Sequence, residues 1–216
     1  MGAFPEAPGR KKFSIVAIDY FTKWVEAEAL TGITHQQVQH FLWKNIICRF
    51  GIPKVLVSDN GWQFQAKPFK EFCSSLGICQ HFSSVDHPKS NGQTEVTNRT
   101  ILQGIKKRLY AVKGKWVEEL PSVLWSYRTT YKTATGDTPF NLTYGTEALI
   151  PVEIGMPGFR VHNFNEETNE EGLKVNLDLV EEVRDQAYFK MQVDKRRVAR
   201  FFNRQVWGRQ FKERDW

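Results

Sequence analysis

The 216-residue sequence predicts a mixed α/β fold with one sizeable core, followed by a long helical extension. Short apolar stretches rich in β-branched residues alternate with stretches in which apolar residues recur at helical spacing, which is typical of an α/β protein. The composition, with 41% apolar and 13% aromatic residues, allows one core of ordinary size. Near the carboxyl end, helical periodicity continues over more than 30 residues, longer than a typical globular helix.

Two strands and a helix are predicted at the amino end. Residues 13–19 (FSIVAID) and 24–29 are apolar and separated by a short polar step, which predicts two sequential strands joined by a turn. Thr34, with Gln37 three positions later, has the pattern of a helix-capping box. Apolar residues then recur at helical spacing until Gly51, where we expect the helix to end.

A strand, a helix and another strand follow. Residues 54–58 (KVLVS) predict a short buried strand whose end carries Asp59 into an Asn-Gly turn. Residues 69–76 have the apolar spacing of an amphipathic helix closed by a glycine. Residues 78–82 alternate between apolar and polar, as in a strand.

The rest of the chain is predicted as a loop, three helices and an irregular connection. Residues 83–92 are dense in turn-forming residues, and helices are expected at about 93–112 and 117–131. High proline and glycine content predicts an irregular connection over 138–158. Helix resumes from 170 to about 204, as a spacer or a coiled-coil arm.

The charge pattern favours a polyanionic partner. The formal net charge is +6 and the pI is about 9.2, and phosphate backbones attract clustered Lys and Arg side chains. Residues 190–214 are distinctly basic, although a solvated helix face would show the same pattern. Binding of phosphate by this segment and simple solvation are therefore both open.

The composition excludes a secreted or membrane-embedded class. The three cysteines form no CxxC pair and are interpreted as core thiols, which favours a reducing compartment. The first residues lack the apolar stretch of a signal peptide, and no run approaches membrane-spanning length. We expect an intracellular, soluble protein with no membrane partner.

Asp59 and Glu95 are the candidate catalytic and metal-binding residues. They are separated by 35 intervening residues, with Asp59 at a predicted strand end and Glu95 in the opening turn of a predicted helix. Mg²⁺ prefers oxygen ligands, and two such ions about 3.5–4 Å apart can activate an attacking hydroxyl and stabilise the leaving oxygen of a phosphoryl transfer. The alternative is a turn aspartate and a glutamate favoured at a helix start by the helix dipole.

Polar residues around these two acids are candidate contacts to nucleic acid. The candidates are Asn60, Lys89, Gln93, Asn98 and Arg99. Asn98 and Arg99 follow Glu95 by three and four positions, so the three share a helix face. For the loop residues, a role in the turn or in solvent is an equally good explanation. Arg99 is the best of the candidates.

Four segments carry a resemblance to a known family. They are VAIDYFTKWVEAEAL, NIICRFGIPKVLVSDNG, HPKSNGQTEVTNR and LPSVLWSYRTTYKTATGDTPFNLTYGTEALIPVE. They are similar to integrases of gypsy-type LTR retrotransposons, and the resemblance covers nearly the whole chain. It implies a fragment of a Pol polyprotein with a ribonuclease H-like mixed sheet flanked by helices. It also implies a nuclear location and DNA integration by 3′-end processing and strand transfer.

The same resemblance implies a D,D-35-E carboxylate triad that binds Mg²⁺ or Mn²⁺, with Asp59 as the second acid and Glu95 as the third. It places the first Asp upstream of Met1, because residues 13–19 resemble the family's second strand. Asp19 is then a structural residue or, less favoured, a substitute ligand. We expect this fragment to be inactive, and a strand missing from the sheet centre to leave an exposed edge.

By this resemblance the chain divides into four parts. These are a remnant of the first strand and linker at 1–12, the catalytic core at 13–150, an irregular connection at 151–169, and a basic helical extension at 170–216 leading to a truncated domain. Integrases of this kind self-associate. The expected partners are therefore DNA and further copies of the chain, in a dimer or a higher oligomer.

Two other functions are open at this point. A non-catalytic remnant would keep nucleic-acid binding and self-association without joining DNA. A ribonuclease H-like nuclease would share the fold but fits the loop-to-helix segment less well. Strand transfer with Mg²⁺ or Mn²⁺ would favour the integrase, whereas salt-dependent DNA binding without joining would favour the remnant.

Overall fold

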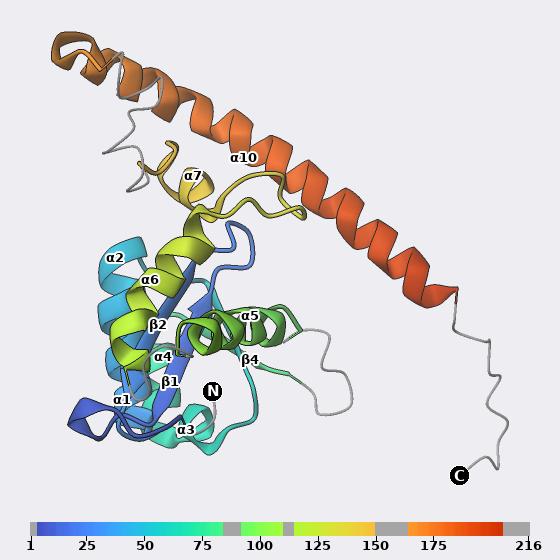
Figure 1. The fold of residues 1–216 in the computed structure, drawn as a ribbon. Helices are drawn as coiled ribbons and strands as arrows, with labels where there is room; N and C mark the ends of the chain where they lie inside the picture. The colour runs from blue at the N-terminus through green and yellow to red at the C-terminus, as the bar shows by residue number, and fades with distance from the viewer. Residues whose placement is uncertain (1–3, 84–91, 110–114, 150–163, 205–216) are drawn as a thin grey trace, which may run out of the picture. The chain divides into compact units, whose positions relative to one another are not determined.

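The structure is a computed structural model (Figure 1). It describes residues 4–83, 92–109, 115–149 and 164–204. The chain forms two compact units, residues 1–128 and 129–216. Each unit is described by itself.

The described strands of the first unit form two separate two-stranded sheets (Figure 1). β1 (Phe13–Ile18) pairs antiparallel with β2 (Val25–Leu30). β3 (Val55–Ser58) pairs in parallel with β4 (Cys79–Phe82). The four predicted strands are therefore confirmed, although β3 is not buried throughout as predicted, since Val55 is 45% exposed. Within the described residues, the antiparallel pair and the parallel pair are not joined into one continuous sheet.

The first predicted helix is confirmed, with a π-helical middle. α1 (His35–Phe41) begins with the predicted capping box, in which the Thr34 hydroxyl accepts from the Gln37 backbone and the Gln37 side chain accepts from the Thr34 N–H. The helix continues as η2 (Leu42–Ile47), a π-helix, and as α2 (Cys48–Phe50). A glycine with a φ of 89° ends it, since such a backbone conformation costs other residues strain.

The other helices of the first unit are η1 (Pro8–Arg10), a 3₁₀ turn, followed by α3 (Trp62–Gln65), α4 (Lys67–Ser75), α5 (Gly92–Leu109) and α6 (Trp116–Thr129). Of these, α4, α5 and α6 agree with the predicted positions, whereas η1 and α3 were not predicted. α4 ends before a glycine with a φ of 71°, as the sequence predicts.

Apolar clusters cover both faces of the β1–β2 pair. The first cluster joins β2 to α5 and α6 through Val25, Ala29, Ile101, Ile105, Trp116, Leu120, Val123 and Leu124. The second joins α1 and η2 to α4 through Val38, Leu42, Ile47, Phe69 and Cys73. Val16 of β1 packs against the first cluster and Ile15 against the second, because neighbouring strand residues point to opposite faces. The strands therefore lie between two helical layers.

The described residues of the second unit form a short helix and a long one. α7 (Pro139–Tyr144) lies within the segment predicted to be irregular, so that prediction was wrong at this point. The Thr138 hydroxyl accepts from the backbone N–H of Asn141 and caps α7. α10 (Glu166–Asn203) confirms the predicted long helix. The Arg184 guanidinium of α10 donates to the carbonyls of Leu142 and Thr143, at 3.1 and 3.2 Å, and so satisfies carbonyls at the end of α7.

The three cysteines occupy two kinds of environment. Cys73 is buried in the second cluster, and burial raises the pKa of its thiol to about 11. Cys48 and Cys79 are exposed, so the interpretation of all three as core thiols was wrong. None of the described helices combines the length and apolar character needed to cross a membrane.

Candidate active site

The candidate site is built where β3 and β4 end. Because the two strands are parallel, their carboxyl ends lie at the same edge, with Ser58 opposite Phe82. The Ser83 N–H donates to the Ser58 carbonyl at 2.9 Å, which extends the pairing by one residue. The Asn60 side-chain amide then donates to the Ser83 carbonyl at 2.9 Å. These bonds hold the turn after β3 against the end of β4.

Asp59 lies in this turn with an exposed carboxylate. Its Oδ1 accepts a hydrogen bond from the Gly61 N–H at 2.9 Å, the pattern of an Asx turn. A Cβ on Gly61 would lie 2.9 Å from this oxygen and against the end of the Gln63 side chain, so a larger residue here would displace these two side chains. Oδ2 of Asp59 has no hydrogen-bond partner among the described residues. One carboxylate oxygen is therefore available for a ligand.

The available oxygen fits a hard cation such as Mg²⁺, which takes oxygen ligands. Glu95 lies in the first turn of α5, as predicted, but its side chain is outside the described residues. The convergence of Asp59 and Glu95 on one ion therefore stays a prediction. Within the described part of the chain, no three His, Cys, Asp or Glu side chains are grouped so that they could hold a metal.

Asp19, considered from the sequence as a substitute metal ligand, is engaged by its own turn. Its Oδ2 accepts from the backbone N–H groups of Phe21 and Thr22, at 2.9 and 2.8 Å, and from the Thr22 hydroxyl at 3.1 Å. Its backbone N–H donates to the Trp24 carbonyl, and its own carbonyl accepts from Lys23. This geometry supports the structural role of Asp19 as the residue that closes the β1–β2 turn.

The predicted nucleic-acid contacts have different environments. Asn60 has a structural role, since its amide bonds Ser83 and its carbonyl accepts from Gln65 Nε2 at 2.9 Å. Arg99 is exposed and has no hydrogen bond or ion pair with the residues that the structure describes. Asn98 is partly buried, and its Oδ1 lacks a hydrogen-bond partner among those residues. Lys89 and the side chain of Gln93 lie outside the described residues.

Trp62 is an exposed aromatic residue beside the site, and the sequence pattern assigned no role to it. It is the first residue of α3, directly after the Gly61 turn, and 63% of its surface is exposed. An indole this exposed gains little from packing within the chain. Its position three residues after Asp59 therefore places an available aromatic ring close to the candidate carboxylate.

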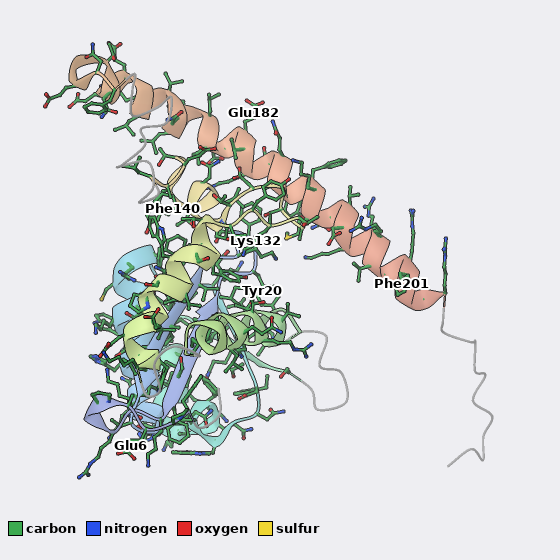
Figure 2. The ribbon with its side chains drawn as sticks, in the orientation of Figure 1. Glu6, Tyr20, Lys132, Phe140, Glu182 and Phe201 are labelled. Carbon is green, nitrogen blue, oxygen red and sulfur yellow. The ribbon has the colours of Figure 1, made fainter. Side chains whose placement is uncertain are left out.

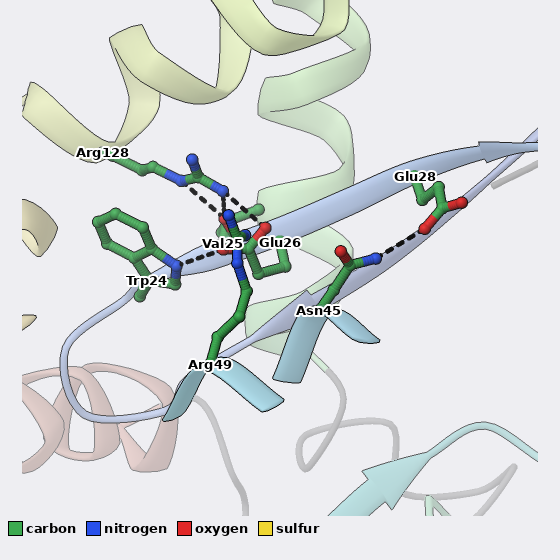
Figure 3. A network of polar contacts seen from close by, with 7 residues as sticks. All are labelled: Trp24, Val25, Glu26, Glu28, Asn45, Arg49 and Arg128. Atoms are coloured by element: carbon green, nitrogen blue, oxygen red, sulfur yellow. Dashed lines mark hydrogen bonds and ion pairs between the residues drawn. The ribbon is translucent and has the colours of Figure 1, made fainter. Parts of the chain in front are cut away.

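A buried ionic network on β2 is the largest polar feature that sequence reasoning missed (Figure 3). Glu26, 4% exposed, accepts from Arg49 Nη1 at 2.8 Å, from Arg128 Nη2 at 2.9 Å and from Trp24 Nε1 at 2.9 Å. Arg128 also donates twice to the Val25 carbonyl and lies 4.3 Å over the Trp24 ring. The network ties β2 to α2 and α6. In the sequence, the local sign of this network was the alternation of glutamates with apolar residues in residues 25–30 (VEAEAL).

Comparison with known proteins shows a likeness to integrase core domains and to viral and transposon polyproteins. Residues 3–88 match the integrase core domain family. The chain is 36% identical over 149 residues to the Gag-Pol polyprotein of avian reticuloendotheliosis virus, which is 69% of this chain and 13% of that protein. It is 28% identical over 198 residues to the Tf2-3 transposon polyprotein of Schizosaccharomyces pombe, which is 88% of this chain and 14% of that protein. The chain thus spans about one seventh of the length of these polyproteins.

Solved structures of integrase catalytic cores share the fold. The core of bovine immunodeficiency virus (BIV) integrase superposes with a TM-score of 0.51 at 25% identity, covering 60% of this chain and 84% of that one. The magnesium complex of the HTLV-2 integrase core, in its trimeric form, gives 0.50 at 24% identity, covering 59% and 82%. An intasome of simian T-cell lymphotropic virus gives 0.56 at 24% identity, covering 64% and 50%.

These likenesses confirm the predicted fold class. The described elements form a mixed α/β architecture, and their structural neighbours are integrase catalytic cores of the ribonuclease H-like type. The position of Asp59, at the end of a strand of the matched region, agrees with a site at the strand ends. Residues 3–88 are therefore similar to the integrase core domain family, and the chain is similar to retroviral Gag-Pol and Tf2 transposon polyproteins.

Proposed function

We propose that the chain is the core of a gypsy-type retrotransposon integrase, which processes DNA 3′ ends and joins them to target DNA by metal-dependent phosphoryl transfer. One observation carries the proposal. Within an integrase core domain, Asp59 stands at the carboxyl end of β3 with a carboxylate oxygen free of partners among the described residues, and Glu95 follows after 35 intervening residues.

Asp59 and Glu95 would hold Mg²⁺ or Mn²⁺. The bound ions would polarise the scissile phosphate and stabilise the leaving oxygen. Asp19 is assigned a structural role in this proposal, because three donors of the β1–β2 turn fix its carboxylate through Oδ2. These 216 residues then supply two of the three carboxylates of the triad, and by themselves they bind a divalent ion weakly and do not join DNA ends.

The DNA would approach the same edge of the molecule. Arg99 presents an exposed guanidinium to phosphate oxygens. Trp62 presents an exposed indole on which an unpaired base at a DNA end could stack, an interaction that contributes about 1–3 kcal/mol per base. Joining two DNA ends requires more than one copy of the chain, so a homo-oligomer in the nucleus is part of the proposal.

The first experiment measures Mn²⁺ binding by electron paramagnetic resonance in matched variants. Asp59→Asn should abolish the bound signal, and Asp19→Asn should leave it unchanged, because three hydrogen bonds from its own turn reach the Asp19 carboxylate and only one reaches Asp59. Both substitutions remove one carboxylate at a strand end, so each is the control for the other. Equal Mn²⁺ binding by Asp59→Asn and the unchanged protein would refute the metal site.

The second experiment measures strand transfer on a DNA duplex with a recessed 3′ end. The unchanged chain should give no joined product with Mg²⁺ or Mn²⁺. Joining that is lost in Asp19→Asn would show that Asp19 is a ligand after all, against the proposal.

A non-catalytic DNA-binding role is the second candidate, favoured by the observation that Asp19 is already engaged. The two functions differ in their need for the metal. The second role predicts DNA binding that weakens with salt. It also predicts equal DNA binding by the unchanged chain and Asp59→Asn, whether Mn²⁺ is present or not. Metal-stimulated binding that Asp59→Asn removes would favour the integrase core.

A further inference from the structure

α10 has two apolar sides, and the fold of the second unit covers only one of them. Ala187 and Met191 are buried, and Val180 lies against Gly145 at the end of α7, so this side packs within the unit. At about 100° per residue, the opposite side of the helix carries a second series. We call this series the outer stripe. It consists of Val175, Leu179, Glu182, Gln186, Phe189 and Val193.

The outer stripe is solvent-exposed along its whole length. Its four apolar members, Val175, Leu179, Phe189 and Val193, are 54%, 48%, 70% and 50% exposed. Figure 2 shows Glu182, at the middle of the stripe, pointing away from α7. Single exposed apolar residues are common on protein surfaces, but these recur at alternating steps of four and three, the spacing of a coiled-coil seam. The stripe therefore has the pattern of a helix-pairing surface about 27 Å long.

The charges along α10 favour one orientation for a paired helix. Residues 166–185 contain eight acidic and two basic side chains, whereas residues 186–203 contain one acidic and five basic. The helix dipole accounts for such a bias only in the terminal turns, and here the acidic stretch reaches the middle of the helix. Two parallel copies would place like charges together. Two antiparallel copies would place the acidic half of each beside the basic half of the other.

The apolar residues of the outer stripe are also symmetric about the middle of α10. Val175 and Val193 lie nine residues before and after Arg184, and Leu179 and Phe189 lie five residues before and after it. An antiparallel pair centred there would bring Val175 against Val193 and Leu179 against Phe189 of the other copy. Gln186 donates to Glu182 of its own helix at 3.4 Å, and in the pair these two residues would meet the same two of the other copy, so that a polar group at the centre would fix the register.

We propose that two copies of this chain pair antiparallel through the outer stripes of α10. Apolar contacts at both ends of the stripe and the opposed charges of the two halves hold the pair together. The surface lies outside the integrase core domain match at residues 3–88, and the proposal does not depend on the proposed metal site.

Two charged variants of the full chain test the pairing by sedimentation velocity. Leu179→Lys and Phe189→Glu should each weaken the pairing by about tenfold or more, because each puts two unpaired charges into a desolvated contact. An equimolar mixture of the two should recover the association, since the lysine introduced in one variant then meets the glutamate introduced in the other. In a parallel pair these positions do not meet, and the mixture would stay as weak as each variant alone.

The matched controls are Leu173→Lys and Val198→Glu, which introduce the same charges on the other side of α10. Both positions are exposed, at 39% and 43%, so neither change should alter folding or pairing. Circular dichroism should show the same helix content in all four variants. A single copy at every concentration, an unchanged association in Leu179→Lys, or no recovery in the mixture would each overturn the proposal.

If another surface of the chain also joins copies, sedimentation does not isolate the pairing through the outer stripe. Cross-linking between outer-stripe positions tests that pairing directly. The exposed Cys48 and Cys79 are first replaced by serine, and Val175→Cys and Val193→Cys are introduced in separate chains. A mixture of these chains should form a disulfide-linked dimer rapidly, and Val175→Cys alone should not. Equal cross-linking of Val175→Cys with itself would indicate a parallel pair and refute the antiparallel one.

Discussion

The β1–β2 pair and the β3–β4 pair use their carboxylates in opposite ways. In the antiparallel pair, Asp19 accepts three hydrogen bonds within the turn, and Glu26 is enclosed by two arginines and an indole. Glu28 accepts from Asn45 at 2.7 Å. At the end of β3, by contrast, the Asp59 carboxylate accepts a single hydrogen bond from the described residues.

The difference shows that the position of an acid at a strand end does not decide its role. Asp19 and Asp59 both follow a strand and both accept from backbone N–H groups of a turn. What separates them is the number of donors that reach the carboxylate. A carboxylate that already accepts several hydrogen bonds is a poorer ligand, because a metal ion would have to compete with those donors for it.

The largest expected effect concerns Glu26 in the antiparallel pair. Glu26→Ala should lower the free energy of unfolding by about 3–5 kcal/mol, because it leaves the Arg128 guanidinium partly buried without its counter-ion. Urea unfolding monitored by circular dichroism measures the change. Glu28→Ala, which removes one hydrogen bond, is the control and should cost about 1 kcal/mol. Equal losses in both variants would contradict a special role for the network.

The second expected effect concerns Cys73, which packs behind the parallel pair. With a pKa of about 11 instead of 9.0, its thiol should react with iodoacetamide at pH 8 about a hundredfold more slowly than an ordinary thiol. Cys48 and Cys79 are exposed and serve as internal controls in peptide mass spectrometry. Faster labelling of Cys73 in Glu26→Ala would mean that the buried thiol is exposed more often. The Glu26 network would then also stabilise the part of the unit around β3, which carries Asp59.

The same thiol predicts a dependence of stability on pH. The unfolded chain loses the Cys73 proton near pH 9, and the folded chain loses it near pH 11. Between these values the folded state binds more protons, so this thiol lowers the free energy of unfolding as the pH rises from about 9 to about 11. Cys73→Ala should reduce that slope in denaturant titrations at several pH values.

A smaller effect is expected at Asp19. Asp19→Ala removes the acceptor of three hydrogen bonds in an exposed turn, so the free energy of unfolding should fall by about 1–2 kcal/mol. Thermal unfolding measures the change. A loss of Mn²⁺ binding without a loss of stability would reverse the assignment of Asp19 as structural.

The smallest effect on stability is expected at Asp59. The oxygen of Asn can still accept from the Gly61 N–H, so Asp59→Asn should change the free energy of unfolding by less than about 0.5 kcal/mol. The same variant should lose Mn²⁺ binding. A large loss of stability would show that the fold depends on Asp59 no less than on Asp19, and the contrast between the two strand pairs would disappear.

Much of the local structure followed from the sequence. The Thr34 and Gln37 capping box, the four strands and the long carboxyl-terminal helix depend on interactions between residues close in the chain, and each is present as predicted. The SDNG segment also predicted the turn that presents Asp59. The short helix α7 was missed because its proline and glycine, which are typical of irregular structure, instead occupy the first helical position and the carboxyl-terminal cap.

The sequence by itself determined which segments become strands and helices and which acid stands after β3, because backbone propensity, capping and turn chemistry act over a few residues. The tertiary structure alone decided that Glu26 would meet Arg128, about one hundred residues away, and that the described strands would pair two by two. It also decided which side of α10 would be covered. Such contacts join residues far apart in the sequence. The local pattern of apolar and polar residues does not specify which distant residue each of them will contact.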